Sequence, residues 1–168
     1  MTDLAIRFAR AEDAATILGF IRELAEYERL AHEVVADEAQ LRASLFGVRP
    51  AAEVLIAEVA GTAVGFALFF QSYSTFLARP GLYLEDLYVQ PPSRGKGVGL
   101  ALMSACARIA VQRNYGRFEW SVLDWNDPAL RFYKSLGAKP MAEWTVQRLV
   151  DHELFALADR WPHAVGRT

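Results

Sequence analysis

The sequence predicts an α/β fold, organised as a single domain whose mixed β-sheet is flanked by helices. Some segments repeat apolar residues at helical spacing, whereas others are short runs of alternating or β-branched apolar residues. These segments follow one another in the order β-α-α-β-β-β-α-β-α-β-α, without an internal repeat, a low-complexity tract or a linker. A chain of 168 residues suits one domain, so we expect the domain to span residues 1–168.

The first half of the chain is expected to form a strand, two helices and a hairpin. Apolar residues at helical spacing predict the first helix, and Asp37 as N-cap with Gly47 as the end indicates the second. Two apolar runs on either side of a turn signal indicate the antiparallel hairpin. The expected ranges are 4–10, 11–27, 37–46, 53–59 and 63–70, followed by a less regular segment over 72–81.

The second half is expected to alternate strands and helices, beginning with a central strand. Its last long helix has Asp127 as the N-cap, Pro128 at the first helical position and Gly137 at the end. The expected ranges are 82–89, 97–115, 117–123, 127–137 and 144–149, with a short helix that begins at Asp151.

Composition and charge exclude several classes of protein. Hydrophobic residues make up 53% of the chain, charged residues 23%, and the net charge of −2 argues against a nucleic-acid binder. The single cysteine, Cys106, excludes an intrachain disulfide and no signal peptide is visible, so we expect a cytoplasmic protein. The longest apolar run, residues 63–70, is too short to span a bilayer. We expect no membrane partner and no metal, because no ligand spacing is seen at His32, His152 and His163.

A glycine-rich loop of sequence Arg-Gly-Lys-Gly-Val-Gly, residues 94–99, joins the predicted central strand to a helix. The first amides of a helix lack partners inside the helix and the dipole is positive there, so this loop predicts an anion site. Arg94 and Lys96 add positive charge, which favours a diphosphate. The spacing matches neither the GxxxxGK[ST] motif of P-loops nor the GxGxxG motif of dinucleotide-binding folds, so ATP, GTP and NAD are not expected.

This loop resembles the Arg/Gln-x-x-Gly-x-Gly/Ala signature of the GCN5-related N-acetyltransferase (GNAT) superfamily. The stretches "LAEYERL", "LYLEDLYV" and "WNDPALRFYKSLGA" are similar to those of its diamine and polyamine acetyltransferases of the spermidine/spermine type. The resemblance implies the GNAT fold, with a mostly antiparallel sheet whose central strand is splayed from its neighbour by a bulge. It also implies acetyl-CoA as cosubstrate, bound by Leu87, Tyr88, Val89, Arg94, Gly95, Lys96, Gly97, Val98, Gly99, Leu100 and Asn126.

Moving an acetyl group from a thioester to an amine needs a base for the amine and a proton for the departing thiolate. Glu85 and Asp86 interrupt an apolar strand, and in a regular strand they point to opposite faces. The resemblance implies that Glu85 is the base, acting through water, and that Tyr133 protonates the thiolate. It places the acceptor amine at Tyr27, Glu28, Glu85 and Asp86.

The acceptor implied by this resemblance is a primary amine of a small cationic molecule, which is a diamine, a polyamine or a lysine-like compound. Residues 73–81 lack the acidic, tryptophan-containing character of the polyamine enzymes, and Gln147 stands where those enzymes have a tryptophan. A peptide amine or an aminoglycoside as acceptor, and a non-catalytic acyl-CoA sensor, stay open as alternatives. The resemblance also implies a homodimer with residues 143–149 at its contact.

Overall fold

The computed structural model describes residues 3–160, so that His163 lies outside the described residues. The chain divides into two compact units, Met1–Ser121 and Val122–Thr168. The first unit contains the whole β-sheet, and the second contains two helices.

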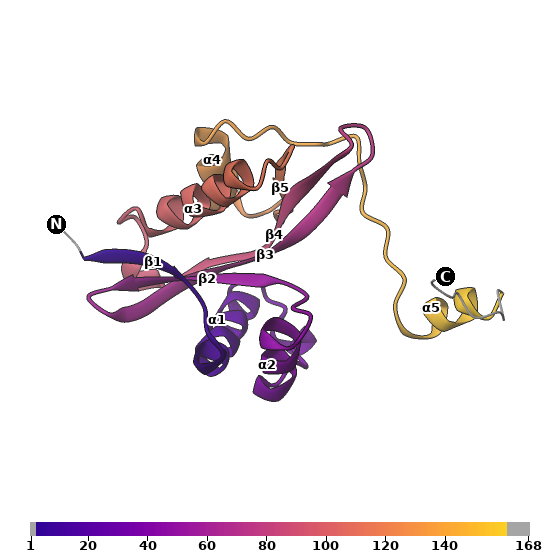
Figure 1. Ribbon diagram of the computed structural model, residues 1–168, viewed down its shortest axis with the longest axis horizontal. Coiled ribbons are helices and arrows are strands. Elements are labelled where there is room, and N and C mark those ends of the chain that lie inside the picture. The colour runs from indigo at the N-terminus through magenta and orange to yellow at the C-terminus, as the bar shows by residue number, and fades with distance from the viewer. Residues whose placement is uncertain (1–2, 161–168) are drawn as a thin grey trace. The chain divides into compact units, whose positions relative to one another are not determined.

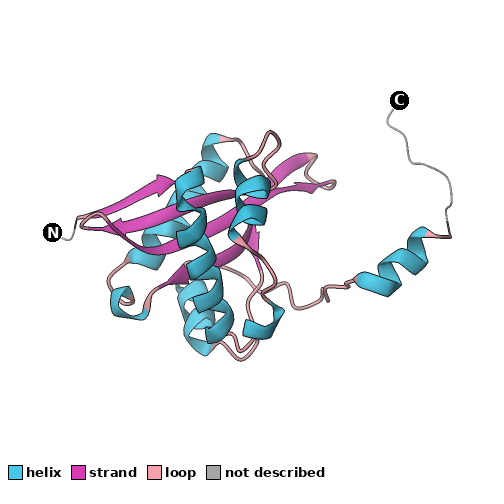
Figure 2. Ribbon diagram, turned by 90° about the horizontal axis from the view of Figure 1, so that it is seen from below, coloured by secondary structure: helices cyan, strands magenta, loops and turns pink. Residues whose placement is uncertain are grey.

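The sheet of the first unit has five strands in the spatial order β1-β2-β3-β4-β5. All neighbours are antiparallel except β4 and β5, which are parallel. Figures 1 and 2 show these strands running together as one twisted sheet. The predicted α/β fold with a mixed, mostly antiparallel sheet is therefore confirmed. The strands are β1 (Leu4–Phe8), β2 (Glu53–Val59), β3 (Thr62–Ser74), β4 (Arg79–Val89) and β5 (Phe118–Trp120).

Helices cover both faces of this sheet (Figure 1). One face carries α1 (Ala14–Tyr27) and α2 (Glu38–Phe46), and the other carries α3 (Val98–Gln112). The short helices are η1 (Ala11–Asp13), η2 (Ala31–Glu33) and η3 (Pro91–Ser93).

The core under α1 is aromatic. Phe20 of α1 stacks on Phe66 of β3, with 5.7 Å between the ring centroids, and lies 6.1 Å from the ring of Tyr88 on β4. All three are buried. This contact anchors α1 to β3 and to β4, and β4 carries the predicted site residues 85–89.

The predicted cap of α2 is confirmed. The carboxylate of Asp37 accepts a hydrogen bond from the Gln40 amide at 2.8 Å, and the Gln40 side chain accepts one from the Asp37 amide at 2.9 Å. This reciprocal pair satisfies two amides that the helix itself leaves without partners. The helix ends at Phe46, one residue before Gly47, as expected.

The prediction of an irregular segment over 72–81 is wrong. Strand β3 continues to Ser74 and β4 already begins at Arg79, so that only a tight turn separates them. Gly81 allows the two strands to approach closely at this end, because a Cβ at this position would lie 2.7 Å from the Ser72 hydroxyl oxygen. The ladder between β3 and β4 therefore extends beyond residues 63–70, the apolar run from which the sequence predicted the second strand of the hairpin.

The second unit contains α4 (Asp127–Ser135) and α5 (Asp151–Ala158). The predicted strand over 144–149 is not formed. Trp144 and Val146, the apolar residues that suggested it, are 74% and 77% exposed, and an alternating pattern alone does not form a strand without a neighbour to pair with.

The predicted N-cap of α4 is also wrong by one residue. Asn126, and not Asp127, is the N-cap, because its side-chain oxygen accepts a hydrogen bond from the Ala129 amide at 3.3 Å. Asp127 is the first helical residue, where its negative charge favours the positive end of the helix dipole. Gly137 follows the helix with a φ of +84°, as its predicted role as terminator requires.

Candidate active site

A β-bulge interrupts β4 at the two adjacent acids. Leu68 of β3 pairs with Asp86, and the next residue, Phe69, pairs with Leu84, so that Glu85 is the extra residue on β4. Side chains alternate between the faces of a regular strand. The bulge breaks that alternation and turns Asp86 to the face covered by α1, whereas Leu84 lies on the opposite face with Phe69.

Hydrogen bonds at both ends of β4 show which backbone groups lie outside its ladder with β3. The Leu82 N–H donates to the Arg117 carbonyl on the β5 side at 3.0 Å, and the Gln90 N–H donates to the Val64 carbonyl on the β3 side at 2.9 Å. Directions alternate along an antiparallel strand. Counting back from Gln90, the Leu87 and Val89 amides point away from β3, and the Tyr88 amide points toward it.

Strand β4 loses its other neighbour just before these amides. Its parallel pairing with β5 covers only Leu82–Leu84 against Phe118–Trp120. Among the described residues, no strand pairs with β4 on this side from Glu85 onward. The amides of Leu87 and Val89 therefore point to a side of β4 that no described strand covers, and β4 has the splay that the family resemblance implies.

The glycine-rich loop follows β4 and leads into α3. Gly95 and Gly97 have φ values of +73° and +84°, a conformation that other residues adopt only with strain. Gly97 is the N-cap of α3, so the amides of Val98, Gly99 and Leu100 are the first of the helix and have no acceptor inside it. No atom lies within 4 Å of where a Cβ would be at either Gly95 or Gly97, so the space beside the loop is open. Lys96 is exposed between them.

The side chain of Arg94 lies over two tyrosine rings. Its guanidinium carbon is 4.9 Å from the centroid of Tyr27, at the end of α1, and 5.4 Å from that of Tyr88. Its Nε donates a hydrogen bond to the Val89 carbonyl at 2.7 Å. The cation of the loop signature is thus in contact with α1 and β4.

Three carboxyl groups lie around the bulge and the C-terminal end of α1. Burial, with the negative charges of Glu85 and Glu28 nearby, raises the pKa of Asp86 to about 6. Burial also raises the pKa of Glu28, the C-cap of α1. Glu85 itself is exposed. The structure therefore brings Glu28, Glu85 and Asp86 into one acidic cluster, in which Asp86 is the carboxyl group shielded from water.

The second unit holds the two remaining predicted residues. Asn126 is 8% exposed and caps α4 through its side chain. Tyr133 is half-buried on the same helix, with its ring centroid 5.4 Å from that of Phe132. Leu136, the C-cap of this helix, is 38% exposed.

Comparison with known proteins identifies the family. Residues 20–138 match the Acetyltransferase (GNAT) family. The chain belongs to this family. It is 38% identical to mouse thialysine N-epsilon-acetyltransferase over 95% of this chain and 100% of the relative. It is 31% identical to human spermidine/spermine N(1)-acetyltransferase-like protein 1, over 91% of this chain and 23% of that protein.

A solved structure agrees with this assignment. An integron cassette protein from the mobile metagenome of V. cholerae has a TM-score of 0.77 and 28% identity, over 92% of this chain and 97% of that one. The predicted GNAT resemblance, the fold and the class of acyltransferase enzyme are therefore confirmed.

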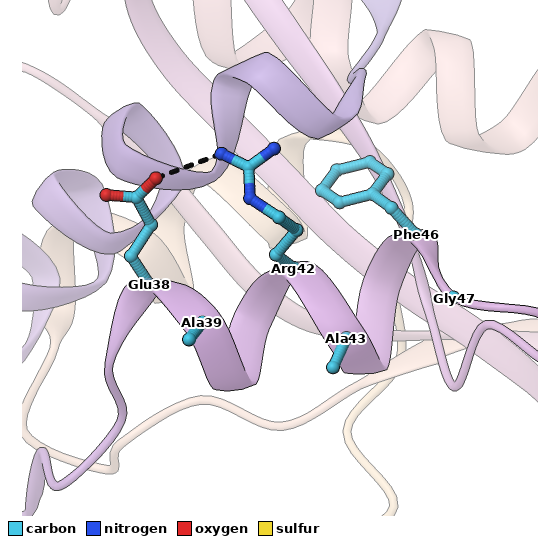
Figure 3. Close-up of a pocket in the computed structure, with 6 residues that line it drawn as sticks. All are labelled: Glu38, Ala39, Arg42, Ala43, Phe46 and Gly47. Atoms are coloured by element: carbon cyan, nitrogen blue, oxygen red, sulfur yellow. Dashed lines mark hydrogen bonds and ion pairs between the residues drawn. The ribbon is translucent and has the colours of Figure 1, made fainter.

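Other hollows and reactive groups of this GNAT chain lie apart from the predicted site residues. A hollow of about 610 Å³ lies beside α2. Figure 3 shows the residues that line it, among which Glu38 and Arg42 form an ion pair at 3.0 Å. Its lining includes none of the predicted residues.

Burial raises the pKa of Cys106 in α3 to about 12, which makes its thiol inert. In the described part of the chain, no helix is long and apolar enough to cross a membrane.

Sequence reasoning missed the network around Tyr88. Glu23 of α1 accepts hydrogen bonds from the Gln90 side-chain amide at 3.2 and 3.3 Å. Burial and a hydrogen bond to Glu23 raise the pKa of the Tyr88 hydroxyl. The partners are 67 residues apart in the chain, and no spacing rule connects them. The one indication in the sequence is the helical period of α1, which places Glu23 and Tyr27 four residues apart on the same side of the helix.

Proposed function

We propose that this GNAT protein transfers an acetyl group from acetyl-CoA to a primary amine of a small cationic acceptor, directly within a ternary complex. One observation carries the proposal. The amides of Leu87 and Val89 point away from the ladder between β3 and β4, and the glycine-rich loop that follows them leads into the N-terminus of α3. An extended arm that ends in a diphosphate fits such a sequence of donors.

The residues present fit acetyl-CoA. The amides of residues 95–100 and the charge of Lys96 would hold the pyrophosphate. Arg94, the first residue of the loop, and Tyr88, which contacts Arg94, are proposed to belong to the same coenzyme site. Leu87 and Val89 would pair with the pantetheine arm and polarise the thioester carbonyl. Asn126 is proposed to bond the pantetheine as well. Acetyl-CoA supplies the activated acetyl group.

Asp86 is proposed to accept the proton from the acceptor nitrogen. A carboxyl group with a pKa of about 6 is a better base at neutral pH than an ordinary carboxylate, and Asp86 is the shielded member of the acidic cluster. Glu85, which the family resemblance implies as the base acting through water, is exposed. It would attract the cation, and it would receive the proton from Asp86 through water and release it to the solvent. The Tyr133 hydroxyl would donate a proton to the departing sulfur as the C–S bond breaks and the C–N bond forms.

The proposed acceptor is a lysine-like amine, a diamine or a polyamine. The acidic cluster of Glu28, Glu85 and Asp86, with Tyr27 beside it, suits a cation. The relatives named for thialysine and for spermidine/spermine support this class. Since the mouse relative matches over nearly the whole chain, we place lysine-like amines first.

The proposal extends to the organisation of the whole protein. We infer that residues 1–168 act as one N-acetyltransferase domain in the cytoplasm, and that two copies form a homodimer through the segment around residues 143–149. The exposed apolar side chains of that segment support the dimer. The single cysteine, buried in α3, supports a reducing compartment.

The test is a thiol-release assay with acetyl-CoA and a panel of thialysine, lysine, ornithine, putrescine, spermidine, a lysine peptide and an aminoglycoside. We expect turnover with at least one small diamine or diamino acid. Tyr133→Phe is expected to reduce kcat by roughly 10²-fold without changing the Kd for CoA, because only the proton donor is lost. CoA binding without turnover of any acceptor would support the sensor alternative, and absence of CoA binding would refute the proposal.

A further inference from the structure

The side chain of Arg94 has a contact set that does not require a phosphate. Its Nε donates a hydrogen bond to the Val89 carbonyl at 2.7 Å, and its guanidinium carbon lies over the rings of Tyr27 and Tyr88. The Arg94 amide is also used, because it donates to the Pro91 carbonyl at 3.2 Å. Both its side chain and its backbone thus contact the protein itself.

These contacts join the coenzyme loop to the acceptor end of α1. Tyr27 is the last residue of α1, and Glu28, one member of the acidic cluster, is its C-cap. Tyr27 is 37% exposed, so only part of its surface is fixed by packing. Tyr88 is buried against Phe20, so the second ring that the guanidinium contacts is held in place by the core.

We propose that Arg94 is a positioning residue for the acceptor site, whose guanidinium braces Tyr27 and the adjoining Glu28 against β4. This inference rests on the proposed function for its catalytic consequence. A cation over an aromatic face is attracted by the ring, and the planar guanidinium can contact two rings at once, which an ammonium does not match. When the neighbouring amides of residues 95–100 bind a diphosphate, the loop and therefore Arg94 are held in place. Binding of acetyl-CoA consequently favours binding of the acceptor, and the reverse holds equally.

The contact itself is tested by a double-mutant cycle on urea unfolding, with Arg94→Gln, Tyr27→Ala and the double variant. We expect the loss of stability in the double variant to be smaller than the sum of the single losses, since each change removes the same contact. Tyr27→Phe keeps the ring and should keep most of the coupling to Arg94. Lys96→Gln, which removes the same charge two residues further on, should show no coupling to Tyr27. Additive losses for Arg94 and Tyr27 would overturn the proposal.

The consequence is tested by kinetics with thialysine at saturating acetyl-CoA, beside calorimetry with CoA alone. We expect Arg94→Gln to raise the KM for thialysine about three- to tenfold, and to raise the Kd for CoA by a smaller factor than Lys96→Gln does. Arg94→Lys should behave like Arg94→Gln, because the charge is kept and the planar stacking is lost. Lys96→Gln should show the opposite split, with weaker CoA binding and an unchanged KM for thialysine.

An Arg94→Gln variant with a raised Kd for CoA and an unchanged KM for thialysine would assign Arg94 to the phosphates and overturn the proposal. Failure of the unmodified protein to acetylate thialysine would count against the proposed acceptor class. In that case the unfolding cycle still decides whether Arg94 braces Tyr27.

Discussion

Two adjacent carboxyl groups show how strongly the surroundings of a single residue change its chemistry. Glu85 and Asp86 are neighbours in the chain, yet Glu85 is exposed and the pKa of Asp86 is raised to about 6. The bulge causes the difference, because it turns Asp86 to the face under α1. A carboxylate in this position is partly removed from water and lies near two other negative charges, so its protonated form is favoured.

The first prediction at this scale concerns the pH dependence of kcat, measured with both substrates saturating. Below about pH 6 Asp86 becomes protonated and cannot accept a proton, so kcat should fall as the pH decreases. Asp86→Asn should lower kcat by roughly 10²- to 10⁴-fold and remove this acid limb. Glu85→Gln should retain more activity and move the limb to lower pH, because loss of a neighbouring negative charge lowers the pKa of Asp86. A greater loss in Glu85→Gln than in Asp86→Asn would return the role of base to Glu85.

At the scale of elements, the loop between β4 and α3 depends on two residues with positive φ. Gly97 ends the loop and caps α3, and its conformation decides where the first helical amides point. Because a Cβ at this position would meet no atom within 4 Å, the cost of a side chain there comes from the backbone alone. A side chain can therefore be added at Gly97 without disturbing the packing around it.

Gly97→Ala is expected to cost about 1–2 kcal/mol of unfolding free energy and to weaken CoA binding at least tenfold, because relief of the strain redirects the amides. The matched control is Gly61→Ala in the turn between β2 and β3, where φ is +76° and the surrounding space is equally open. It should lose similar stability and keep its affinity for CoA. Urea unfolding and calorimetry measure the two effects. Equal losses of CoA affinity in both variants would show that the loop has no special role.

Much of the element level could be predicted from the sequence, because it depends on local chemistry. The cap at Asp37, the glycine stop after α4 and the glycine loop all use residue types with strong local preferences. The bulge at Glu85 could not be predicted from the residues of β4, since it is a property of the register with β3. The contact between the Arg94 guanidinium and the Tyr27 ring joins residues that are distant in the chain, so no periodic pattern in the sequence predicts it.

At the scale of the whole molecule, the segment between α4 and α5 has apolar residues without the strand that its sequence suggested. Trp144 and Val146 alternate with polar residues, as in a strand with one buried face, yet both are largely exposed. A second chain would provide the neighbour that such a strand needs. The strand prediction is wrong for the described chain, because a local pattern does not report whether a neighbouring strand is present to pair with the segment.

The corresponding prediction is a concentration-dependent dimer, measured by sedimentation equilibrium. Val146→Asp should shift the protein toward the monomer, because it places a charge on the apolar side of the segment. Thr145→Asp adds the same charge to the adjacent residue, which faces the other way in a strand, and should have a smaller effect. A protein that is monomeric at every concentration tested would contradict the proposed dimer.

The additional residue in β4, Glu85, links the position of a carboxyl group to the direction of the backbone amides that follow it. Whether a carboxyl group lies under α1 and whether the amides beyond it can bind a ligand both depend on the same offset at Glu85. If β4 kept Glu85 and paired in regular register without the bulge, Asp86 would turn to the opposite face and the amides of Leu87 and Val89 would turn toward β3 in a single step. The face of the proposed proton acceptor and the direction of the proposed ligand-binding amides therefore change together whenever the register of β4 changes.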